Sequence, residues 1–293
     1  MSAETPAVGT GAAPRPRRRR TARRLAGWAR ALVGLVIALM FLLPLYIAFV
    51  TSFDTKAHVF VFPPHLVPDW DWHPYVRVWQ MARWGMYFMN SVFITATSIA
   101  IALTTSVLAA YAFAFIRFRG REKLFIAVLV VLMIPAEALL IPNYIILHMM
   151  NLINTYWAQI LPYGASVFGI FLLRQFFLSL PSSYWDAACM DGAGHLRFLW
   201  SVALPLCKPT LLTIGLYIFI GAWNSFQWPL IVTTSHHVQP IEVAIQRLAQ
   251  QHSVDWRRIS AAGIAATMPL VIIFFLIQKH IIRGISRGEG IQG

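Results

Sequence analysis

Long uncharged runs alternate with short charged segments along this chain. The first run, Ala31 to Val50, has 20 uncharged residues, enough for a helix to cross about 30 Å of hydrocarbon. It exceeds a signal-peptide core and no small-residue cleavage site follows, so we expect it to stay as an anchor. The same pattern recurs, and we predict an all-α membrane protein with six transmembrane helices at residues 31–50, 84–116, 124–150, 152–173, 210–232 and 259–278.

Two of these runs carry further information. In 84–116, small side chains recur every three or four residues and form a seam along one helix face, which lets another helix approach closely. The seam is Ser91, Thr95, Ser98, Ala102, Thr105, Ala109 and Ala112. The run 124–150 contains Pro135 and Pro142, which predict breaks in its helix, with Glu137 between them.

Lysine and arginine are distributed unevenly between the two sides that six spans define. The side of the termini carries eighteen, in groups of eight, four, three and three, against six on the other side. The positive-inside rule therefore predicts that both termini and the segment 183–209 are cytoplasmic. We expect residues 1–30 to be a disordered basic tail, 31–282 the membrane domain and 283–293 a second cytoplasmic tail.

Composition agrees with a membrane protein. The chain is 58% hydrophobic and only 12% charged, whereas soluble domains have about 25% charged residues. The net charge of +13 does not indicate nucleic-acid binding, because the charges cluster at the ends of apolar runs. Cys189 and Cys207 both fall in 183–209, where a reducing cytoplasm favours free thiols over a disulfide.

The sequence lacks the common signatures of catalysis. No G-x-x-x-x-G-K-[ST] loop, H-E-x-x-H motif or Cys/His cluster at metal-binding spacing occurs. We therefore predict that the chain is not an enzyme and holds neither a metal nor a cofactor.

The segment 183–209 is polar although apolar runs flank it, so it must lie in water on one side of the membrane. Its first half favours a helix, Gly192 interrupts that helix, and a second amphipathic turn follows through Phe198. We expect Leu204-Pro205 to end this turn. Such a helix–glycine–helix hairpin can dock into a groove on a soluble partner.

The spacing of this segment resembles the EAA loop of ABC-importer permeases, E-A-A-x3-G-x9-I-x-L-P. Asp186-Ala187-Ala188, Gly192, Val202 and Leu204-Pro205 occupy the motif positions, with Asp186 in place of Glu and Val202 in place of Ile. From about Leu32 onward the chain resembles the second permease subunit of maltose-permease-like carbohydrate importers. The strongest blocks are IPNYIILHMMNLINTYWAQILPY, LLRQFFLSLPSSYWDAACMDGA, LPLCKPTL and IIRGISRGEG.

That resemblance implies a type I ABC importer permease in a bacterial cytoplasmic (inner) membrane, with a coupling-helix hairpin. It implies a heterodimer with a second permease and two ATPase subunits, which bind ATP and Mg and contact 183–209. An extracytoplasmic solute-binding protein would contact loops 51–83 and 233–258, which we expect to be exposed. The coupling residues implied are Asp186, Ala187, Ala188, Asp191, Gly192, Arg197, Leu204 and Pro205.

Individual roles follow from chemistry. Asp186, Asp191 and Arg197 can make charge-assisted contacts with the ATPase, and the two alanines permit close packing. We expect Gly192 to be required where a Cβ would clash.

Four residues are candidates for the translocation pathway. Glu137 is the one carboxylate inside an apolar run and should face the bundle interior or a wet cavity; its alternative role is a structural acid. GAWNSFQWPL resembles a segment of sugar permeases, and its Asn224, Gln227 and Trp228 are the other three candidates. Their alternative role is interhelical hydrogen bonding with an interfacial aromatic belt.

The resemblance favours import of a di- or oligosaccharide. Glycerol phosphate, a glycerophosphodiester or another small polar solute remains open, and an amino-acid or peptide permease is the nearest rival. An ion-coupled secondary transporter would need more intramembrane acids and a repeat. A receptor or scaffold would not require the hairpin.

Overall fold

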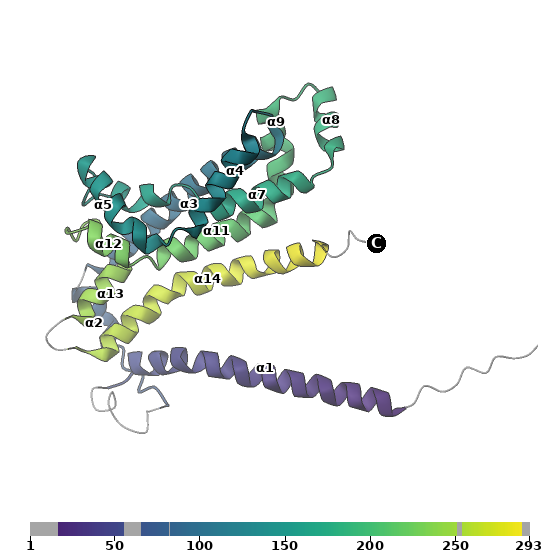
Figure 1. The fold of residues 1–293 in the computed structure, drawn as a ribbon. Helices are drawn as coiled ribbons and strands as arrows, with labels where there is room; N and C mark the ends of the chain where they lie inside the picture. The colour runs from purple at the N-terminus through teal and green to yellow at the C-terminus, as the bar shows by residue number, and fades with distance from the viewer. Residues whose placement is uncertain (1–16, 56–65, 82, 251–253, 289–293) are drawn as a thin grey trace, which may run out of the picture.

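A computed structural model describes residues 17–55, 66–81, 83–250 and 254–288. Within these residues all regular structure is helical and no strand occurs, which confirms the all-α prediction (Figure 1). The elements are α1 (Arg17–Ser52), α2 (His73–Met81), α3 (Trp84–Phe115), α4 (Arg121–Val130), η1 (Val131–Met133), η2 (Ala136–Leu139), α5 (Leu140–Met149), α6 (Tyr156–Ile160), η3 (Leu161–Tyr163), α7 (Val167–Ser179), α8 (Ser182–Met190), α9 (His195–Phe198), η4 (Leu199–Ala203), α10 (Leu204–Leu206), α11 (Lys208–Trp223), α12 (Gln227–Val232), α13 (Ile241–Ala249) and α14 (Trp256–Gly288).

Three helices, α1, α3 and α14, are long and apolar enough to cross a membrane. Three bent pairs pass the same test only when both halves are taken together. Their bends are 98° between Arg121–Met133 and Ala136–Met149, 42° between Tyr156–Tyr163 and Val167–Ser179, and 80° between His195–Leu206 and Lys208–Trp223. The described residues thus hold three spans, or up to six if each bent pair is one span, and the count of six stays a prediction.

Proline accounts for some of the breaks. Pro135 separates η1 from η2, and the preceding Ile134 is extended, as a residue before proline prefers. The expected break at Pro142 is wrong: Pro142 lies in the first turn of α5, where its missing N–H leaves no hydrogen bond unmade. The predicted span 210–232 is also divided, because α11 ends at Trp223 and α12 begins at Gln227.

The expected helix stop at Leu204-Pro205 is wrong as well. The helix continues through α10, and the sharp bend falls at Cys207, just before α11. Ahead of Pro205 the ladder widens to a π-turn, in which the Leu204 N–H donates to the Leu199 carbonyl five residues back. A proline has no N–H for the ordinary ladder, and a locally widened turn accommodates it.

The helix α3 lies at the centre of the packing, against α7 and α11. The first four residues of the predicted seam are buried: Ser91, Thr95, Ser98 and Ala102 are each at most 2% exposed. The other three, Thr105, Ala109 and Ala112, are half-buried. Gly169 of α7 approaches so closely that a Cβ would lie 3.0 Å from both Ile214 and Ser106. Small residues therefore let three helices meet at short range, although the α3 residue at this contact, Ser106, is not part of the predicted seam.

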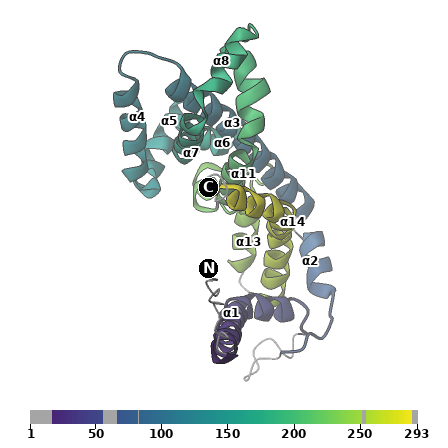
Figure 2. The same cartoon turned by 90° about the vertical axis from the view of Figure 1, so that its right-hand side faces the viewer.

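A short arm, α4 to α5, stands out from the side of this group (Figure 2). Arg174, 7% exposed in α7, fixes one end of it: its Nη2 donates to both carboxylate oxygens of Glu122, at 2.8 and 2.9 Å. The guanidinium also lies 4.0 Å from the centre of the Phe125 ring. The predicted span 152–173 ends too early, because α7 continues to Ser179 and encloses this arginine.

The two segments predicted as exposed loops contain helices. The segment 51–83 includes α2, and 233–258 includes α13, which packs against α3 and α14. Ile241 and Val243 of α13 are fully buried. The prediction of wholly exposed loops is therefore wrong for the described residues, and 56–65 and 251–253 lie outside them.

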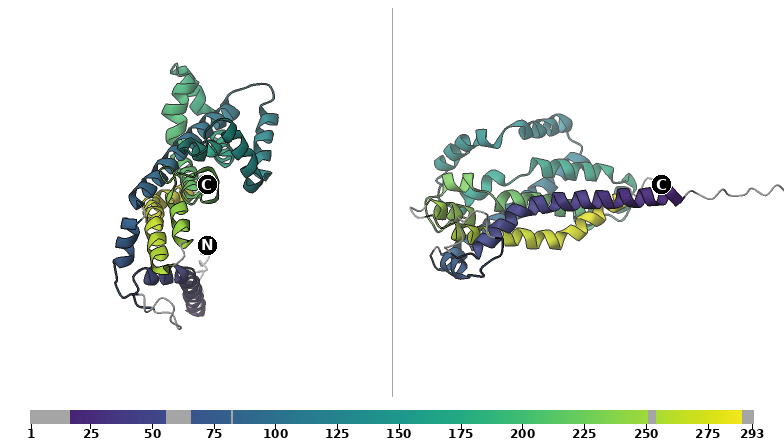
Figure 3. Two further views of the ribbon diagram at one scale, coloured as in Figure 1. Left: turned by 90° about the vertical axis from the view of Figure 1, so that its left-hand side faces the viewer. Right: turned by 90° about the horizontal axis from the view of Figure 1, so that it is seen from below.

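The chain ends also differ from expectation. The helix α1 begins at Arg17, so residues 17–30 of the predicted disordered tail are helical, while 1–16 lie outside the described residues. The helix α14 continues to Gly288, into the predicted C-terminal tail 283–293, of which 289–293 lie outside. The helix α1 packs against α14 (Figure 3).

Candidate functional site

Residues 182–207, here called the hairpin, lie at one end of the helices, and α2, α12 and α13 lie at the other (Figure 1). Its first helix, α8, ends in a Schellman motif. The Gly192 N–H donates to the Cys189 carbonyl at 3.0 Å, and the Ala193 N–H donates to the Ala188 carbonyl at 2.9 Å. Gly192 has φ of +73°, the left-handed conformation that this motif needs.

The expected reason for Gly192 is therefore wrong in one respect. No atom lies within 4 Å of the position that a Cβ would take there. Glycine is needed for its backbone conformation, which costs an L-residue free energy, and not to avoid a clash.

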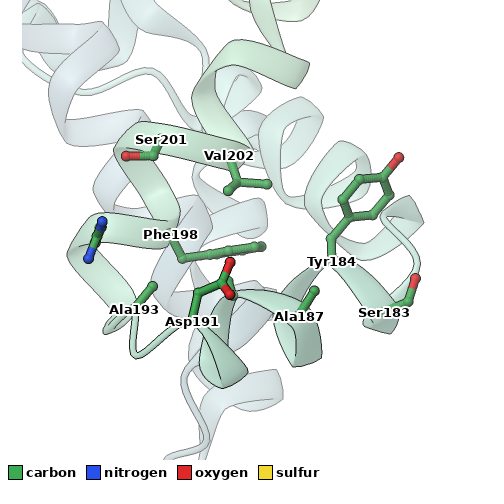
Figure 4. A pocket seen from close by; sticks show the side chains of 10 residues that line it. Ser183, Tyr184, Ala187, Asp191, Ala193, Phe198, Ser201 and Val202 are labelled. Atoms are coloured by element: carbon green, nitrogen blue, oxygen red, sulfur yellow. The ribbon is translucent and has the colours of Figure 1, made fainter.

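The structure brings four of the predicted coupling residues to one hollow of about 540 Å³ between α8, the end of α9 and η4 (Figure 4). We call it the hairpin hollow. Ala187, Ala188, Asp191 and Arg197 line it, together with Ser183, Tyr184, Ala193, Phe198, Ser201 and Val202. Asp186, Gly192, Leu204 and Pro205 do not line it, although Asp186, Gly192 and Pro205 are exposed on the same hairpin.

An aromatic cluster that sequence reasoning missed attaches the hairpin to α3. Trp185 stacks on His195 with ring centroids 4.5 Å apart and planes 15° from parallel. Phe198 meets Trp185 edge-on at 5.0 Å. From α3, the Tyr111 hydroxyl lies 3.0 Å from Nδ1 of His195. The hairpin is thus held to a membrane-spanning helix by ring packing and a hydrogen bond.

The two cysteines are free thiols, as predicted. Cys189 is exposed on α8, and Cys207 is buried at the bend before α11. Among the described residues, no three His, Cys, Asp or Glu side chains are placed to hold a metal ion.

The four pathway candidates are not gathered at one place. Glu137 is exposed in η2, and Gln227 is exposed at the start of α12. Asn224 donates from Nδ2 to the Ile220 carbonyl at 3.0 Å, which closes the end of α11. Trp228 is buried and donates from Nε1 to the Ala158 carbonyl at 2.9 Å, which ties α12 to α6.

A buried polar network holds the segment after α12, at the end of the molecule away from the hairpin. Asn90 of α3 donates from Nδ2 to the carbonyls of His237 and Gln239, both at 2.9 Å. The Tyr156 hydroxyl in turn donates to Oδ1 of Asn90 at 2.8 Å. The bond to Gln239, a fully buried residue, satisfies a backbone carbonyl that would otherwise be buried without this partner.

A charge cluster joins the first described loop to the start of α14. Arg257, 7% exposed, donates to the Asp54 carbonyl at 3.3 Å and lies 3.4 Å from Asp71 and 3.1 Å from Asp255. Burial acts to raise the pKa of the Asp255 carboxyl. The hydrogen bonds from Arg257 and the charges of Arg257 and Arg258 outweigh burial, so the pKa is lowered below its usual value.

Comparison with known proteins defines the class to which this fold belongs. Residues 102–287 match the family described as the binding-protein-dependent transport system inner membrane component. The chain belongs to this family.

Its relatives are permease proteins of transport systems. The sn-glycerol-3-phosphate transport system permease protein UgpE of Yersinia pestis is 32% identical over 261 residues, which cover 86% of this chain and 92% of that protein. The arabinooligosaccharides transport system permease protein AraQ of Halalkalibacterium halodurans is 31% identical over 212 residues, covering 71% and 76%.

A solved structure shares the fold. One chain of a bacterial ABC transporter involved in the import of the acidic polysaccharide alginate superposes with a TM-score of 0.80 and 25% identity, over 94% of this chain and 99% of that one. The fold is therefore that of a type I ABC importer permease, as the EAA-like spacing predicts. The relatives are transport subunits, which agrees with the absence of catalytic motifs in this sequence.

Proposed function

We propose that this chain forms half of a heterodimeric pore that imports a di- or oligosaccharide, driven by ATP and Mg bound in two partner ATPase subunits. The observation that carries the proposal is the hairpin: an exposed, hollowed surface with fixed attachment to α3. Asp191 and Arg197 at the hollow offer charge-assisted hydrogen bonds to the ATPase. Ala187 leaves room for a partner helix to approach.

Movement would pass from the ATPases through the hairpin into the membrane. When the ATPases close, the hairpin moves with them, and the Trp185–His195–Tyr111 contacts carry α3 along. Because α3 packs along α7 and α11, its displacement changes the interior of the bundle. Asp186, exposed beside the hollow, adds a further charge for the partner.

The opposite end of the molecule would meet the solute-binding protein, through parts of 51–83 and 233–258. In this proposal the network around Asn90 holds the outer segment in a defined shape, which lowers the ordering cost of docking. One chain of an alginate transporter solved with its solute-bound periplasmic protein shares the fold at a TM-score of 0.62.

Glu137, Asn224 and Gln227 are exposed on this chain and can face the pathway beside the second permease. Trp228, being buried, would act by positioning α12. Import of glycerol phosphate is the second candidate, which the identity with UgpE favours.

The natural cysteines test the orientation. Cys189 should react with a membrane-impermeant maleimide in inverted vesicles and not in intact spheroplasts, because we place the hairpin in the cytoplasm. Addition of the ATPase subunits should protect it. Cys189→Ser should abolish labelling, since Cys207 is buried. Labelling of Cys189 from outside the cell, or a purified complex without an ATP hydrolase, would contradict the proposal.

A further inference from the structure

A cavity of about 540 Å³ lies between α3, η1, η2, the start of α7 and α11; we call it the central cavity. Ser98, which reaches it from α3, is near the middle of that 32-residue helix. Its volume is in the range of small-molecule sites, about 300–1,000 Å³. The lining residues are Ser98, Leu132, Ala136, Tyr163, Ala165, Ser166, Val167, Phe168, Tyr217, Ile218, Ile220, Gly221 and Ala222.

A smaller compartment adjoins the central cavity and shares Ser98, Tyr163 and Ala222 with it. Its volume of about 10 Å³ has room for about one water molecule. Gln159 lines this inner compartment and is only 2% exposed. The compartment therefore gives the apolar cavity a polar inner end.

The Gln159 side chain is only half satisfied. Its Nε2 donates to the Val238 carbonyl at 2.9 Å, whereas Oε1 has no hydrogen-bond partner among the described residues. A buried acceptor left unpaired destabilises the fold. A hydroxyl group of a bound molecule, directly or through one water, would satisfy it.

The wall of the central cavity combines aromatic rings with hydroxyl groups. Phe168 and Tyr217 have ring centroids 4.9 Å apart, inclined at 48°. Ser98, Tyr163 and Ser166, which also line the cavity, carry hydroxyl groups. Rings that cover the apolar face of a ligand, with hydroxyls at its edge, suit a polyhydroxylated ring better than an acyl chain.

The charge of the lining residues narrows the chemical class of the ligand further. None of the described residues that line the central cavity or the inner compartment is Asp, Glu, Lys, Arg or His. A phosphate or carboxylate taken out of water needs a cation or several strong donors. We propose that the central cavity is a subsite for a neutral sugar unit, with Phe168 and Tyr217 against its face and Gln159 at its inner end. This rests on the proposed importer function and goes beyond it, since it assigns solute contacts to this chain.

The test uses the complete complex with its own second permease, ATPases and binding protein, held by a non-hydrolysable ATP analogue. The probe is a tritiated neutral arabino-oligosaccharide, whose Kd is measured by equilibrium dialysis. Phe168→Ala and Tyr217→Ala should each raise Kd roughly two- to twelvefold, the loss expected for one aromatic contact. Tyr217→Phe keeps the ring and should raise Kd less. Phe275→Ala, an exposed aromatic of α14 outside the cavity, should leave Kd unchanged.

A second measurement tests whether anions compete with the neutral probe. Unlabelled sn-glycerol 3-phosphate and an oligouronate serve as competitors, and neither should displace the probe. The inference is overturned if either anion competes as well as the neutral sugar, or if Kd is unchanged in both alanine variants. It is also overturned if those variants lose only a co-purified phospholipid. Uptake by the wild-type complex is scored separately. A complex that imports only an anion overturns the neutral subsite and leaves the importer function standing, whereas a complex without an ATPase overturns the function itself.

Discussion

At the scale of single residues, two neighbouring glycines of the hairpin do different things. Gly192 has φ of +73°, whereas Gly194 has φ of −80°, which any residue adopts. Neither has an atom within 4 Å of its would-be Cβ. A Cβ would have equal room at the two positions, so the two glycines differ only in backbone conformation.

We therefore predict that Gly192→Ala destabilises the end of α8 by about 1–2 kcal/mol, the cost of left-handed backbone for an L-residue. Amides around Ala193 should then exchange with deuterium roughly 5–30 times faster in the purified complex. Gly194→Ala is the matched control and should exchange at the wild-type rate. Equal exchange in the two variants would show that the turn does not depend on this conformation.

Sequence reasoning reached the exposed residues of the site better than the buried ones. Asp191 and Arg197 line the hairpin hollow. They could be predicted because motif spacing and solvent exposure can both be inferred from neighbouring residues in the sequence. Gln159 and Arg174 were not found. Their partners are distant in the chain: the Val238 carbonyl for Gln159 and Glu122 for Arg174. A single sequence does not show such pairings.

At the scale of elements, the aromatic cluster makes α8 and α9 one unit with the end of α3. The Trp185–His195 stack lies within the hairpin, and the Tyr111 hydroxyl extends the contact to α3. A lever transmits force only if its parts do not slide against each other. The stack supplies that stiffness where short helices have little of their own.

A double-mutant cycle of Trp185→Ala and His195→Ala should give a coupling energy of about 0.5–1.5 kcal/mol, because each ring loses the same partner. Either single variant should reduce solute-stimulated ATP hydrolysis, and the double variant should add little further loss. Hydrogen exchange of the hairpin amides and the ATPase rate measure the two effects. Additive losses would mean that the rings do not act together.

Element positions were predicted from hydropathy, and the breaks at Pro135 and Gly192 were predicted from residue type, whereas the other interruptions were not. The apolar runs correspond to helices or bent helix pairs, but α2 and α13 lie in segments that read as polar loops. The helix α13 alternates apolar and polar residues at helical spacing. Because of its polar face, a prediction based on long apolar runs does not detect it. The gap before α12 falls at Asn224–Phe226, with no proline to mark it.

At the scale of the whole molecule, Arg257 connects parts that are remote in the chain. It joins the loop after α1, the segment before α2 and the start of α14. A buried guanidinium is stable only while its anionic partners stay charged. Acid should therefore loosen this junction.

The direction of this pH dependence of stability follows from Asp255, whose pKa is lowered in the folded chain. Its stabilising contribution is full above the ordinary value of about 3.9 and is lost as pH falls through the lowered folded value. We predict that Asp255→Asn lowers Tm at neutral pH and flattens the fall of Tm below about pH 4. Thermal unfolding of the detergent-solubilised complex measures this.

Asp186→Asn, which changes an exposed carboxylate of the hairpin, should keep the wild-type Tm profile. If the two asparagine variants give the same acid profile, the junction is not the acid-sensitive part of the molecule.

The pairing of α1 with α14 bears on how the chain is made. The first span packs against the last one, so the ribosome has to finish nearly the whole chain before the two can meet. Until then α1 must remain in lipid without α14. Its residues from Gly27 to Tyr46 are exposed on every side in the finished fold as well, so the contact with α14 involves the C-terminal end of α1, where Val50 and Ser52 are buried. Membrane insertion of the first segment and closure of the finished fold are thus separate events in time, and a truncation that removes α14 should leave α1 inserted but without its partner.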